Sequence, residues 1–503
     1  MRISIIPMVI GLALFAGAAF GVALALWGIP AIEQVIVERE TSKYLKSGHL
    51  PIAYHVYSLE DVRRFVEAVL PLGISVSERS AEKMLKVVRE TYAAPYKAAL
   101  TPPASDEVIA TYLEKTGLLT EMNLGREAAL EALRSIDPSI HHLVPAMDYC
   151  QYYPSFPEST DLAQLRLPAE FEPQGAVVLA WPIYYPFRWD EHTQFTTAIA
   201  SVAEAHILVP DVYWQKAVEL YLRAKNVSTD HIRFIHARVE DVWTRDYMPA
   251  TVLDRNQRPY LIANPYIQSG PPFNKGEQEA PMELGKSYGV PLIRLPVVIE
   301  GGNIISDGQG TIMLFDSVFK MNQDITPEKL KAVFARYFGA RRVILFPALK
   351  GEFTGHIDMV VKFVDCDRLM VASSDPSYKW HGDFEAIAKR LSETPSSNGR
   401  PYEVIRVPMA ISNNASPDFW SYVNSLTVNG KVIIPMYGVS RDQAAIALYK
   451  RAMPNYEVIG IDFRDFPLGS VHCQSKEIPA SLFQNRVRDT GSHSSMYVPM
   501  TRF

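Results

Sequence analysis

The chain has very little cysteine. Only Cys150, Cys366 and Cys473 occur among its 503 residues. Three cysteines are too few for a disulfide scaffold, and their spacing matches no zinc-binding pattern, so we expect no thiolate metal site. A disulfide between Cys150 and Cys366 would suit an exported protein. Two unrelated cysteines are the simpler interpretation.

Motifs for nucleotide and nucleic-acid binding are also missing. The chain has no GxGxxG sequence and no Walker loop, so nucleotide binding has no support. Its net charge is only −5, and no stretch of basic residues interleaved with aromatic residues occurs. We therefore expect no nucleic-acid partner.

Charge is absent from the N-terminal segment. Residues 3–32 contain no Lys, Arg, Asp or Glu, and this apolar run exceeds the roughly 20 residues that cross a bilayer. We expect residues 1–32 to be an export signal that stays as a transmembrane anchor. A cleaved signal peptide, with Ala23-Leu24-Ala25 as the cleavage site, is the alternative. In both cases the rest of the chain is expected outside the cytoplasm, either membrane-anchored or secreted.

The next region has helical periodicity. Apolar residues recur at helical spacing from Val62 to Leu70, after Ser80, and from Arg126 to Ile136. Residues 33–160 are therefore predicted to form a helical accessory domain or stalk. The prolines between residues 154 and 168 predict a linker.

From residue 165 onward the pattern is that of an α/β fold. Short apolar or β-branched runs alternate with helical stretches, although no sequence repeat is visible. Because loops after strands often carry the chemistry of such folds, polar residues in these loops are candidates for a site. The predicted strands are residues 177–181, 206–210, 233–237, 311–315, 342–346, 432–436 and 457–461.

Two motifs supply groups for nucleophilic catalysis. GSVHCQS (469–475) contains Cys473, and TGHID (354–358) contains His356 and Asp358. A thiol attacks well only as a thiolate, so its neighbours matter as much as the sulfur. If residues 354–365 form a strand, His356 and Asp358 point the same way. Taken alone, this pair is as well explained by a satisfied polar edge.

Three weaker motifs accompany them. WTRD (243–246) places an Arg beside an Asp, which is typical of a structural ion pair. EGGN (300–303) follows the apolar run 297–299, which predicts a tight turn with close backbone approach and puts Glu300 at the end of a strand. Asn424 in YVN and His472 beside Cys473 carry little information singly.

The order WTRD, EGGN, TGHID, YVN and HC resembles the agmatine deiminase and bacterial (Porphyromonas-type) peptidylarginine deiminase family of the pentein superfamily. LPAEFEPQGAVVLAWP (167–182) resembles the opening segment of this family, so the resemblance covers residues 165–503. It implies that this catalytic domain is a pentein-type five-bladed α/β propeller of ββαβ units. The chain departs from the family at Met248, where Gly is usual, and at Phe171, where Trp is common. Met248 is expected to narrow the pocket.

The resemblance implies roles for individual residues. Cys473 would be the nucleophile, His356 the general acid/base, and Asp246 and Asp358 the carboxylates that hold a guanidinium. Two carboxylates suit a planar cation with forked N–H donors. Attack by sulfur, loss of ammonia and hydrolysis of the thiouronium would need no metal and no organic cofactor.

The resemblance also implies supporting residues. Glu300 would support the catalytic His, and Trp243 would pack on the guanidinium or on the alkyl arm of the substrate. Asn424 would make a polar contact near the nucleophile. Arg245 is expected only to pair structurally.

The substrate is left open. It would be peptidyl-arginine or agmatine, converted to citrulline or N-carbamoylputrescine plus ammonia. Export favours arginine within or at the end of a protein, but a C-terminal carboxylate needs a cation, and residues 263–278 supply only Lys275. The expected partners are thus a guanidino compound or arginyl peptide and, through the apolar segment, a membrane. An amidinotransferase and a catalytically silent, membrane-anchored guanidine-binding protein are the alternatives, and the oligomeric state stays open.

Overall fold

The computed structural model describes residues 104–138, 152–153, 156–157, 160, 162–183, 185–239, 241–263, 266, 275–352, 354–410, 419–464 and 470–484. The predicted transmembrane segment, the helical runs before residue 104 and Cys150 lie outside these residues. Within the described part of the chain, no helix has the length and apolar character needed to cross a membrane. The chain divides into two compact units, residues 1–126 with 184–187 and residues 127–183 with 188–503.

The described part of the first unit is helical. Ser105 caps α7 (Asp106–Lys115) by accepting a hydrogen bond from the backbone N–H of Val108. Gly117 adopts a left-handed conformation before the short helix α8 (Leu118–Glu121). The helix α9 (Arg126–Ser135), which belongs to the second unit from Glu127 onward, confirms the helix predicted over 126–136.

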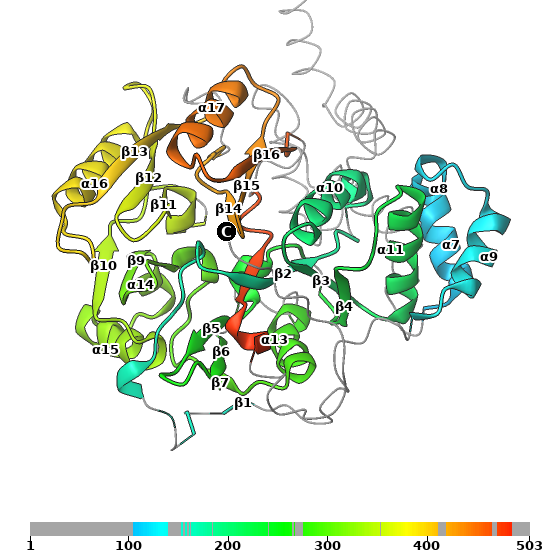
Figure 1. Ribbon diagram of the computed structural model, residues 1–503, viewed down its shortest axis with the longest axis horizontal. Coiled ribbons are helices and arrows are strands. Elements are labelled where there is room, and N and C mark those ends of the chain that lie inside the picture. Colours follow the sequence, from blue (N-terminus) through cyan, green and yellow to red (C-terminus); the bar gives the residue numbers. More distant parts are fainter. Residues whose placement is uncertain are drawn as a thin grey trace, which may run out of the picture. The chain divides into compact units, whose positions relative to one another are not determined.

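The second unit contains five sheets, which Figure 1 shows spread around a common centre. All seven predicted strands are present, so the α/β prediction is confirmed. The sheets, with their strands in spatial order, are β17 (Lys476–Pro479), β2 (Gln174–Ala180), β3 (Glu204–Val209) and β4 (Ile232–His236); β5 (Ala250–Leu253), β6 (Pro259–Ala263), β7 (Leu292–Arg294) and β1 (Tyr152–Tyr153); β8 (Ile305–Ser306), β9 (Thr311–Phe315) and β10 (Arg342–Phe346); β11 (Val361–Phe363), β12 (Arg368–Ser373) and β13 (Glu403–Pro408); and β14 (Leu426–Val428), β15 (Lys431–Met436) and β16 (Glu457–Asp462).

One pairing pattern recurs in all five sheets. A first strand pairs antiparallel with a second, and the second pairs parallel with a third, for example β11 with β12 and β12 with β13. Parallel neighbours need a crossover, which a helix supplies in each sheet. The repeat therefore exists in the topology, although the sequence does not display it. The helices between parallel strands are α10 (Trp189–Ala200), α11 (Val212–Ala224), α13 (Lys275–Tyr288), α15 (Pro327–Phe338), α16 (His381–Glu393) and α17 (Asp442–Ala452).

Helix α15 illustrates how sequence determines these crossovers. Thr326 accepts a hydrogen bond from the N–H of Lys329, Pro327 occupies the first turn, and Gly339 ends the helix in a left-handed conformation. Such an N-terminal cap contributes about 1 kcal/mol. The helix buries Leu330 and Phe334 against its sheet. The remaining short elements are α12 (Thr244–Tyr247), α14 (Val318–Met321), α18 (Ser481–Gln484) and the 3-10 turns η3 (Leu162–Gln164), η4 (Pro186–Arg188), η5 (Gly301–Asn303) and η6 (Ile357–Met359).

The predicted linker is instead part of the second unit. Strand β1 pairs parallel with β7. Phe156 is buried and its ring lies 5.4 Å from that of Tyr260 and 5.7 Å from that of Tyr337. The sequence did not predict this packing, because β1 is only two residues long and leaves no strand pattern. Phe156 is buried by contacts with residues that lie far along the chain.

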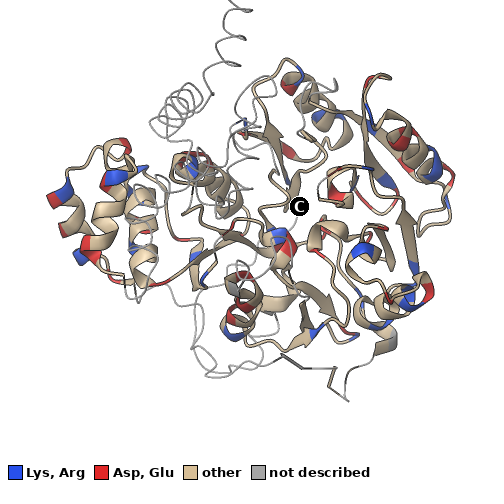
Figure 2. Ribbon diagram, turned by 180° about the vertical axis from the view of Figure 1, so that it is seen from behind, with Lys and Arg blue, Asp and Glu red and all other residues tan. Residues whose placement is uncertain are grey.

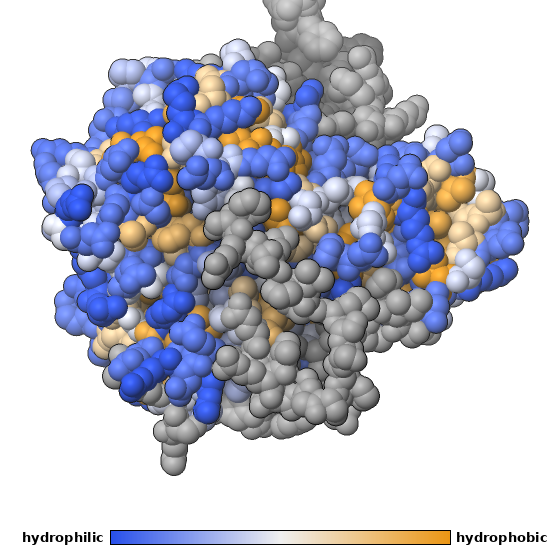
Figure 3. All heavy atoms as spheres, viewed as in Figure 1, coloured by the Kyte–Doolittle hydropathy of each residue, from blue (hydrophilic) through white to orange (hydrophobic). Residues whose placement is uncertain are grey.

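The surface of the molecule is mixed in charge. Basic and acidic residues are interspersed in the view of Figure 2, without a stripe of one sign. The face in Figure 3 is largely hydrophilic, with scattered apolar residues. Met321 is the large apolar side chain that is exposed among the described residues. The described residues on the face in Figure 3 offer no extended apolar patch as a docking surface.

Candidate active site

Three short turns carry most of the predicted site residues. Asp246 lies in α12, Glu300 directly precedes η5, and His356 directly precedes η6. The prediction of a strand over 354–365 is therefore wrong, because β11 begins only at Val361. The three side chains are nevertheless buried within hydrogen-bonding or ion-pairing reach of one another.

Side-chain hydrogen bonds hold η5 and η6 in place. They replace the backbone hydrogen bonds that a strand would make. Asn303, at the end of η5, donates to the carbonyl of Phe315 at 3.1 Å and accepts from its N–H at 2.8 Å. It also donates to Ser317 Oγ at 3.0 Å, and Ser317 donates to the carbonyl of Gly355 at 2.6 Å. Because Gly355 precedes His356, these bonds link the EGGN motif to the TGHID motif.

The prediction that Glu300 ends a strand is also wrong. Strand β7 ends at Arg294, and the apolar run 297–299 lies in an irregular segment. Val297 and Ile299 are buried in the hydrophobic core. The run 297–299 is thus apolar because its side chains pack in the core, although its backbone pairs with no described strand.

The paired glycines of EGGN allow close backbone approach, as predicted. A Cβ atom on Gly301 would lie 1.9 Å from the carbonyl oxygen of Arg245. A Cβ atom on Gly302 would lie 2.5 Å from Nδ1 of His356 and 2.9 Å from Oδ1 of Asp246. The N–H of Gly302 donates to the same Asp246 oxygen at 2.9 Å. Only glycine fits between these groups.

Cys473 lies in a turn just before β17 and is buried. The side chain of Asn424 organises this turn, since its Nδ2 donates to Cys473 Sγ at 3.2 Å. Its Oδ1 accepts from the hydroxyl of Ser470 at 2.8 Å and from the N–H groups of His472 and Cys473 at 3.2 and 3.3 Å. On another side, Met359 of η6 places its sulfur 3.9 Å from that of Cys473.

His356 is held between carboxylates. Its Nε2 lies 2.8 Å from Glu300 Oε2, and its Nδ1 lies 3.6 Å from Asp246 Oδ1. Nδ1 has no hydrogen-bond partner. The arrangement leaves one ring nitrogen available and fixes the other, as a general acid/base requires.

Asp358 lies in η6 and is buried. Its Oδ2 contacts Nδ1 of His472 at 2.7 Å, whereas its buried Oδ1 has no hydrogen-bond partner. A buried carboxylate oxygen without a donor is costly unless a ligand supplies one. This oxygen is therefore a candidate acceptor for a cationic ligand.

The carboxylates change the pKa of their neighbours. Burial, followed by the charges of Asp358 and Asp246, raises the pKa of Cys473 well above its usual range. Burial alone would lower the pKa of His356, but Asp246, Glu300 and Asp358 raise it to about 10. Burial also raises the pKa of Asp246 to about 7, with His356 opposing and the other carboxylates adding to the shift. Sulfur, imidazole and carboxylates thus act on one another electrostatically.

Arg245 makes the structural ion pair that its sequence context predicts. Its guanidinium lies 2.6 Å from Glu477 of β17, and its Nε donates to the carbonyl of His472 at 3.3 Å. Its backbone N–H donates to the carbonyl of Cys473 at 3.1 Å. Arg245 therefore ties α12 to the nucleophile turn. Trp243, which directly precedes α12, is buried.

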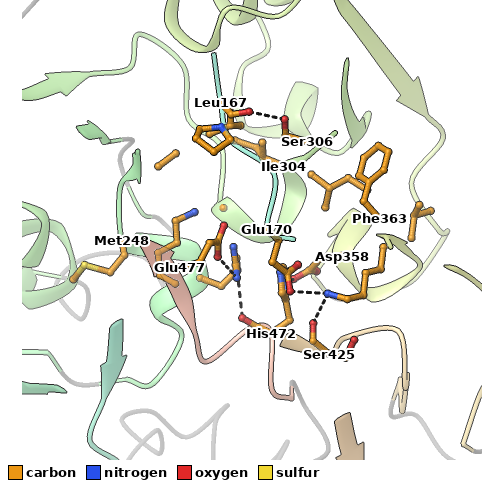
Figure 4. A pocket seen from close by; sticks show the side chains of 18 of the residues that line it. Leu167, Glu170, Met248, Ile304, Ser306, Asp358, Phe363, Ser425, His472 and Glu477 are labelled. Atoms are coloured by element: carbon orange, nitrogen blue, oxygen red, sulfur yellow. Dashed lines mark hydrogen bonds and ion pairs between the residues drawn. The ribbon is translucent and has the colours of Figure 1, made fainter. Parts of the chain in front are cut away.

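A cavity of about 50 Å³, measured as the space open to the centres of water molecules, lies beside these residues (Figure 4). Asp358, Arg245 and His472 line it, and so does Met248, but Cys473, His356 and Asp246 do not. His356 is placed by its contacts with Glu300 and Asp246, and Cys473 by the hydrogen bond that it accepts from Asn424. The cavity therefore lies against the wall that carries Asp358 and His472.

Several residues of this wall were not assigned from the sequence. Glu170 lies in the segment 167–182, which resembles the opening of the family, and Lys362 lies in β11. Glu170 lies 3.2 Å from His472 and 2.6 Å from Lys362. Such contacts between distant segments leave no local pattern. Among the residues that the structure describes, no group of three or more His, Cys, Asp or Glu side chains is arranged to hold a metal ion.

Residues 166–479 match the family model of the Porphyromonas-type peptidyl-arginine deiminases, and all groups of the site described above fall in this range. The chain belongs to this family. A "Putative agmatine deiminase" of Vibrio parahaemolyticus is 26% identical over 349 residues, which cover 62% of this chain and 96% of that relative. A protein of the same description from Shewanella frigidimarina is 27% identical over 354 residues, covering 62% and 94%.

Solved structures give the same fold. The structure described as a putative arginine deiminase from Porphyromonas gingivalis has a TM-score of 0.56 and 26% identity, and the match covers 63% of this chain and 99% of that one. The agmatine deiminase of Enterococcus faecalis has a TM-score of 0.58 and 19% identity, with 65% and 99% covered. The second unit is thus a mixed α/β fold of the pentein type.

Proposed function

We propose that this chain is a hydrolase that deiminates a guanidino group through a covalent intermediate on Cys473. One observation supports this most strongly: a buried thiol, an imidazole and two carboxylates come together from three separate segments, and the carboxylates act electrostatically on both the thiol and the imidazole. Family membership supports the same reaction. It does not favour the amidinotransferase or the silent binding protein.

The two carboxylates supply the affinity for the substrate. Asp358 offers an oxygen without a hydrogen-bond donor, and Asp246 offers a second buried carboxylate. A guanidinium can donate to both at once through its forked N–H groups. Burial and, after it, the charges of Asp358 and Asp246 hold the pKa of Cys473 high, and the positive charge of the guanidinium offsets these two negative charges. Binding therefore lowers the pKa of the thiol at the moment when a thiolate is needed.

The reaction then needs three proton transfers. The sulfur of Cys473 bonds to the central guanidino carbon, and the tetrahedral adduct expels ammonia, which takes a proton from His356. Water then attacks the thiouronium and gives one proton to His356. The carbon–sulfur bond breaks as the remaining hydroxyl proton of the adduct passes to the solvent. The products are a ureido compound and ammonia, and the thiolate is regenerated. Glu300 keeps the imidazole oriented through its 2.8 Å contact.

Two supporting roles belong to this proposal. Asn424 donates to the sulfur and so stabilises it as a thiolate. Trp243 packs on the guanidinium or on the alkyl arm, which predicts that Trp243→Ala raises KM more than it lowers kcat. An unchanged KM would remove Trp243 from the substrate contacts.

We propose two substrate classes for the same site. The similar proteins described above are named agmatine deiminases, whereas the family model is named for peptidyl-arginine. Both carry the guanidino group that the site would hold, and the sequence-based expectation of export favours a peptide.

Two features of the wider architecture complete the proposal. The five sheets form a five-bladed propeller, which is supported by β17, since it pairs antiparallel with β2 and so joins the last strand to the first sheet. The apolar residues 3–32 direct the chain to a membrane or out of the cell. Cell fractionation with N-terminal sequencing tests this, and an intact chain found only in the cytosolic fraction would contradict it.

The test of function is a panel of guanidines. Purified protein is incubated separately with agmatine, free arginine and peptides with internal or terminal arginine, and both ammonia and the ureido product are measured. We expect equimolar ammonia and ureido product from at least one of them. A folded protein that releases ammonia from none of them overturns the proposal.

A further inference from the structure

We propose that His472 is a positioning residue, which holds the substrate carboxylate Asp358 from behind as the central member of a buried chain Lys362–Glu170–His472–Asp358. This inference rests on the proposed function and assigns a role to the histidine beside the nucleophile. Figure 4 shows Glu170, Asp358 and His472 together on the wall of the cavity.

The two oxygens of Asp358 have different surroundings, because His472 contacts only one of them. His472 Nδ1 lies 2.7 Å from Oδ2. The other oxygen, Oδ1, is buried and has no hydrogen-bond partner. A carboxylate held on one oxygen can present the other in a fixed direction, which is what bidentate recognition of a planar guanidinium needs.

The opposite side of the ring is fixed as well. His472 Nε2 lies 3.2 Å from Glu170 Oε2. The other oxygen of Glu170 accepts from Lys362 Nζ at 2.6 Å and from the N–H of Thr427, and Lys362 also donates to the carbonyl of Ser425 at 2.9 Å. Burial alone would raise the pKa of Glu170, but Lys362 and His472 hold it well below its usual range. Glu170 is therefore a fixed negative charge.

The ring of His472 thus lies between two carboxylates. A neutral imidazole has one N–H and could donate to only one of them, whereas an imidazolium donates to both. The ring contacts Oδ2 of Asp358, and Oδ1 of the same carboxylate has no hydrogen-bond partner among the described residues. Lys362 comes from β11, Ser425 precedes β14, and Glu170 precedes β2, so the chain of contacts joins three sheets.

The backbone of His472 is also fixed by hydrogen bonds. Its N–H is bound by Asn424 Oδ1 and its carbonyl by Arg245 Nε. Cys473 follows directly, so one residue links the nucleophile turn to the carboxylate that would hold the substrate. The position of Asp358 relative to the sulfur is then set through His472.

The test compares two buried histidines. His472→Gln removes the ring between the carboxylates. His206→Gln is the matched control, because His206 is also buried and contacts Glu204 at 3.0 Å and the hydroxyl of Tyr288, on β3 and apart from the catalytic groups. A structural role alone predicts similar losses of thermal stability in both variants and no specific loss of binding.

Binding is measured in the Cys473→Ala background by calorimetry with agmatine and an arginyl peptide, and turnover is measured in the wild-type background. We expect His472→Gln to weaken guanidine binding by about ten- to hundredfold, as the loss of a hydrogen bond to a charged group does. KM should rise by a similar factor, while His206→Gln leaves both quantities unchanged. Glu170→Gln keeps the shape but removes the charge, and we expect a smaller change in the same direction.

The two possible failures can be told apart. A wild-type protein that deiminates a guanidine, together with a His472→Gln variant whose affinity and KM match those of His206→Gln, overturns this inference alone. A wild-type protein that neither binds nor deiminates any of the guanidines overturns the proposed function and this inference with it.

Discussion

At the scale of single residues, the site depends on how buried charges share their protons. Burial raises the pKa of Asp246 to about 7, and the carboxylates around His356 raise its pKa to about 10. The two groups are in contact, so their protons are lost in steps that belong to the pair. At a pH between these two pKa values, His356 is an imidazolium and Asp246 is a carboxylate.

This pairing predicts the pH dependence of kcat/KM. Asp246 binds a cation only as a carboxylate, so kcat/KM should fall as the pH drops below about 7. His356 must carry a proton for departing ammonia, so kcat/KM should fall again above about 10. Steady-state kinetics across this range, with circular dichroism as a check on folding, measures both limbs. A value of kcat/KM that stays constant well below pH 7 would contradict the assignment of Asp246.

Residue types in the motifs were readable from the sequence, but their partners were not. Cys473, His356 and the two aspartates follow from motif order and from the chemistry of thiols and guanidinium ions. The contact of His472 with Glu170 is not encoded in either segment, because it arises only when β17 pairs in one sheet with β2, which lies far away in the chain. Sequence proximity to Cys473 was the only available signal for His472.

At the scale of elements, strands were predictable where they are continuous apolar runs. The predicted strands 311–315 and 342–346 agree with β9 and β10 at both ends. The turns η5 and η6 were not predictable, because bonds such as Asn303 to Phe315 come from another segment and replace the strand ladder. The site is built on these turns.

The close approach at η5 predicts a sharp effect of one methyl group. In Gly302→Ala the new Cβ atom would lie within 2.5 Å of His356 Nδ1, which must shift the imidazole or the turn. We expect kcat/KM to fall by about 10²-fold, the cost of displacing a catalytic group by roughly 1 Å. Gly382→Ala in α16 is the matched control, since nothing lies within 4 Å of its Cβ position. Equal kcat/KM in the two variants would show that the turn tolerates the methyl group.

At the scale of the whole molecule, the five repeated sheets bring distant segments to one centre. α12, η5, η6 and the turn before β17 each supply one part of the site, and all lie in the second unit. The α/β class followed from the alternation of short apolar runs with helical stretches. The pairing of β1 with β7 and the burial of Phe156 did not follow from the sequence, because their partners lie far along the chain.

The central claim is that Cys473 forms the covalent bond to the guanidino carbon. The most direct measurement compares Cys473→Ala with Cys366→Ala, which alters the other described free cysteine. Ammonia release is followed during turnover, and acid-quenched protein is analysed by mass spectrometry. We predict that Cys366→Ala keeps the wild-type rate and carries the mass of the substrate minus ammonia on Cys473, whereas Cys473→Ala shows neither activity nor adduct. Ammonia release by Cys473→Ala at the rate of Cys366→Ala would contradict the account.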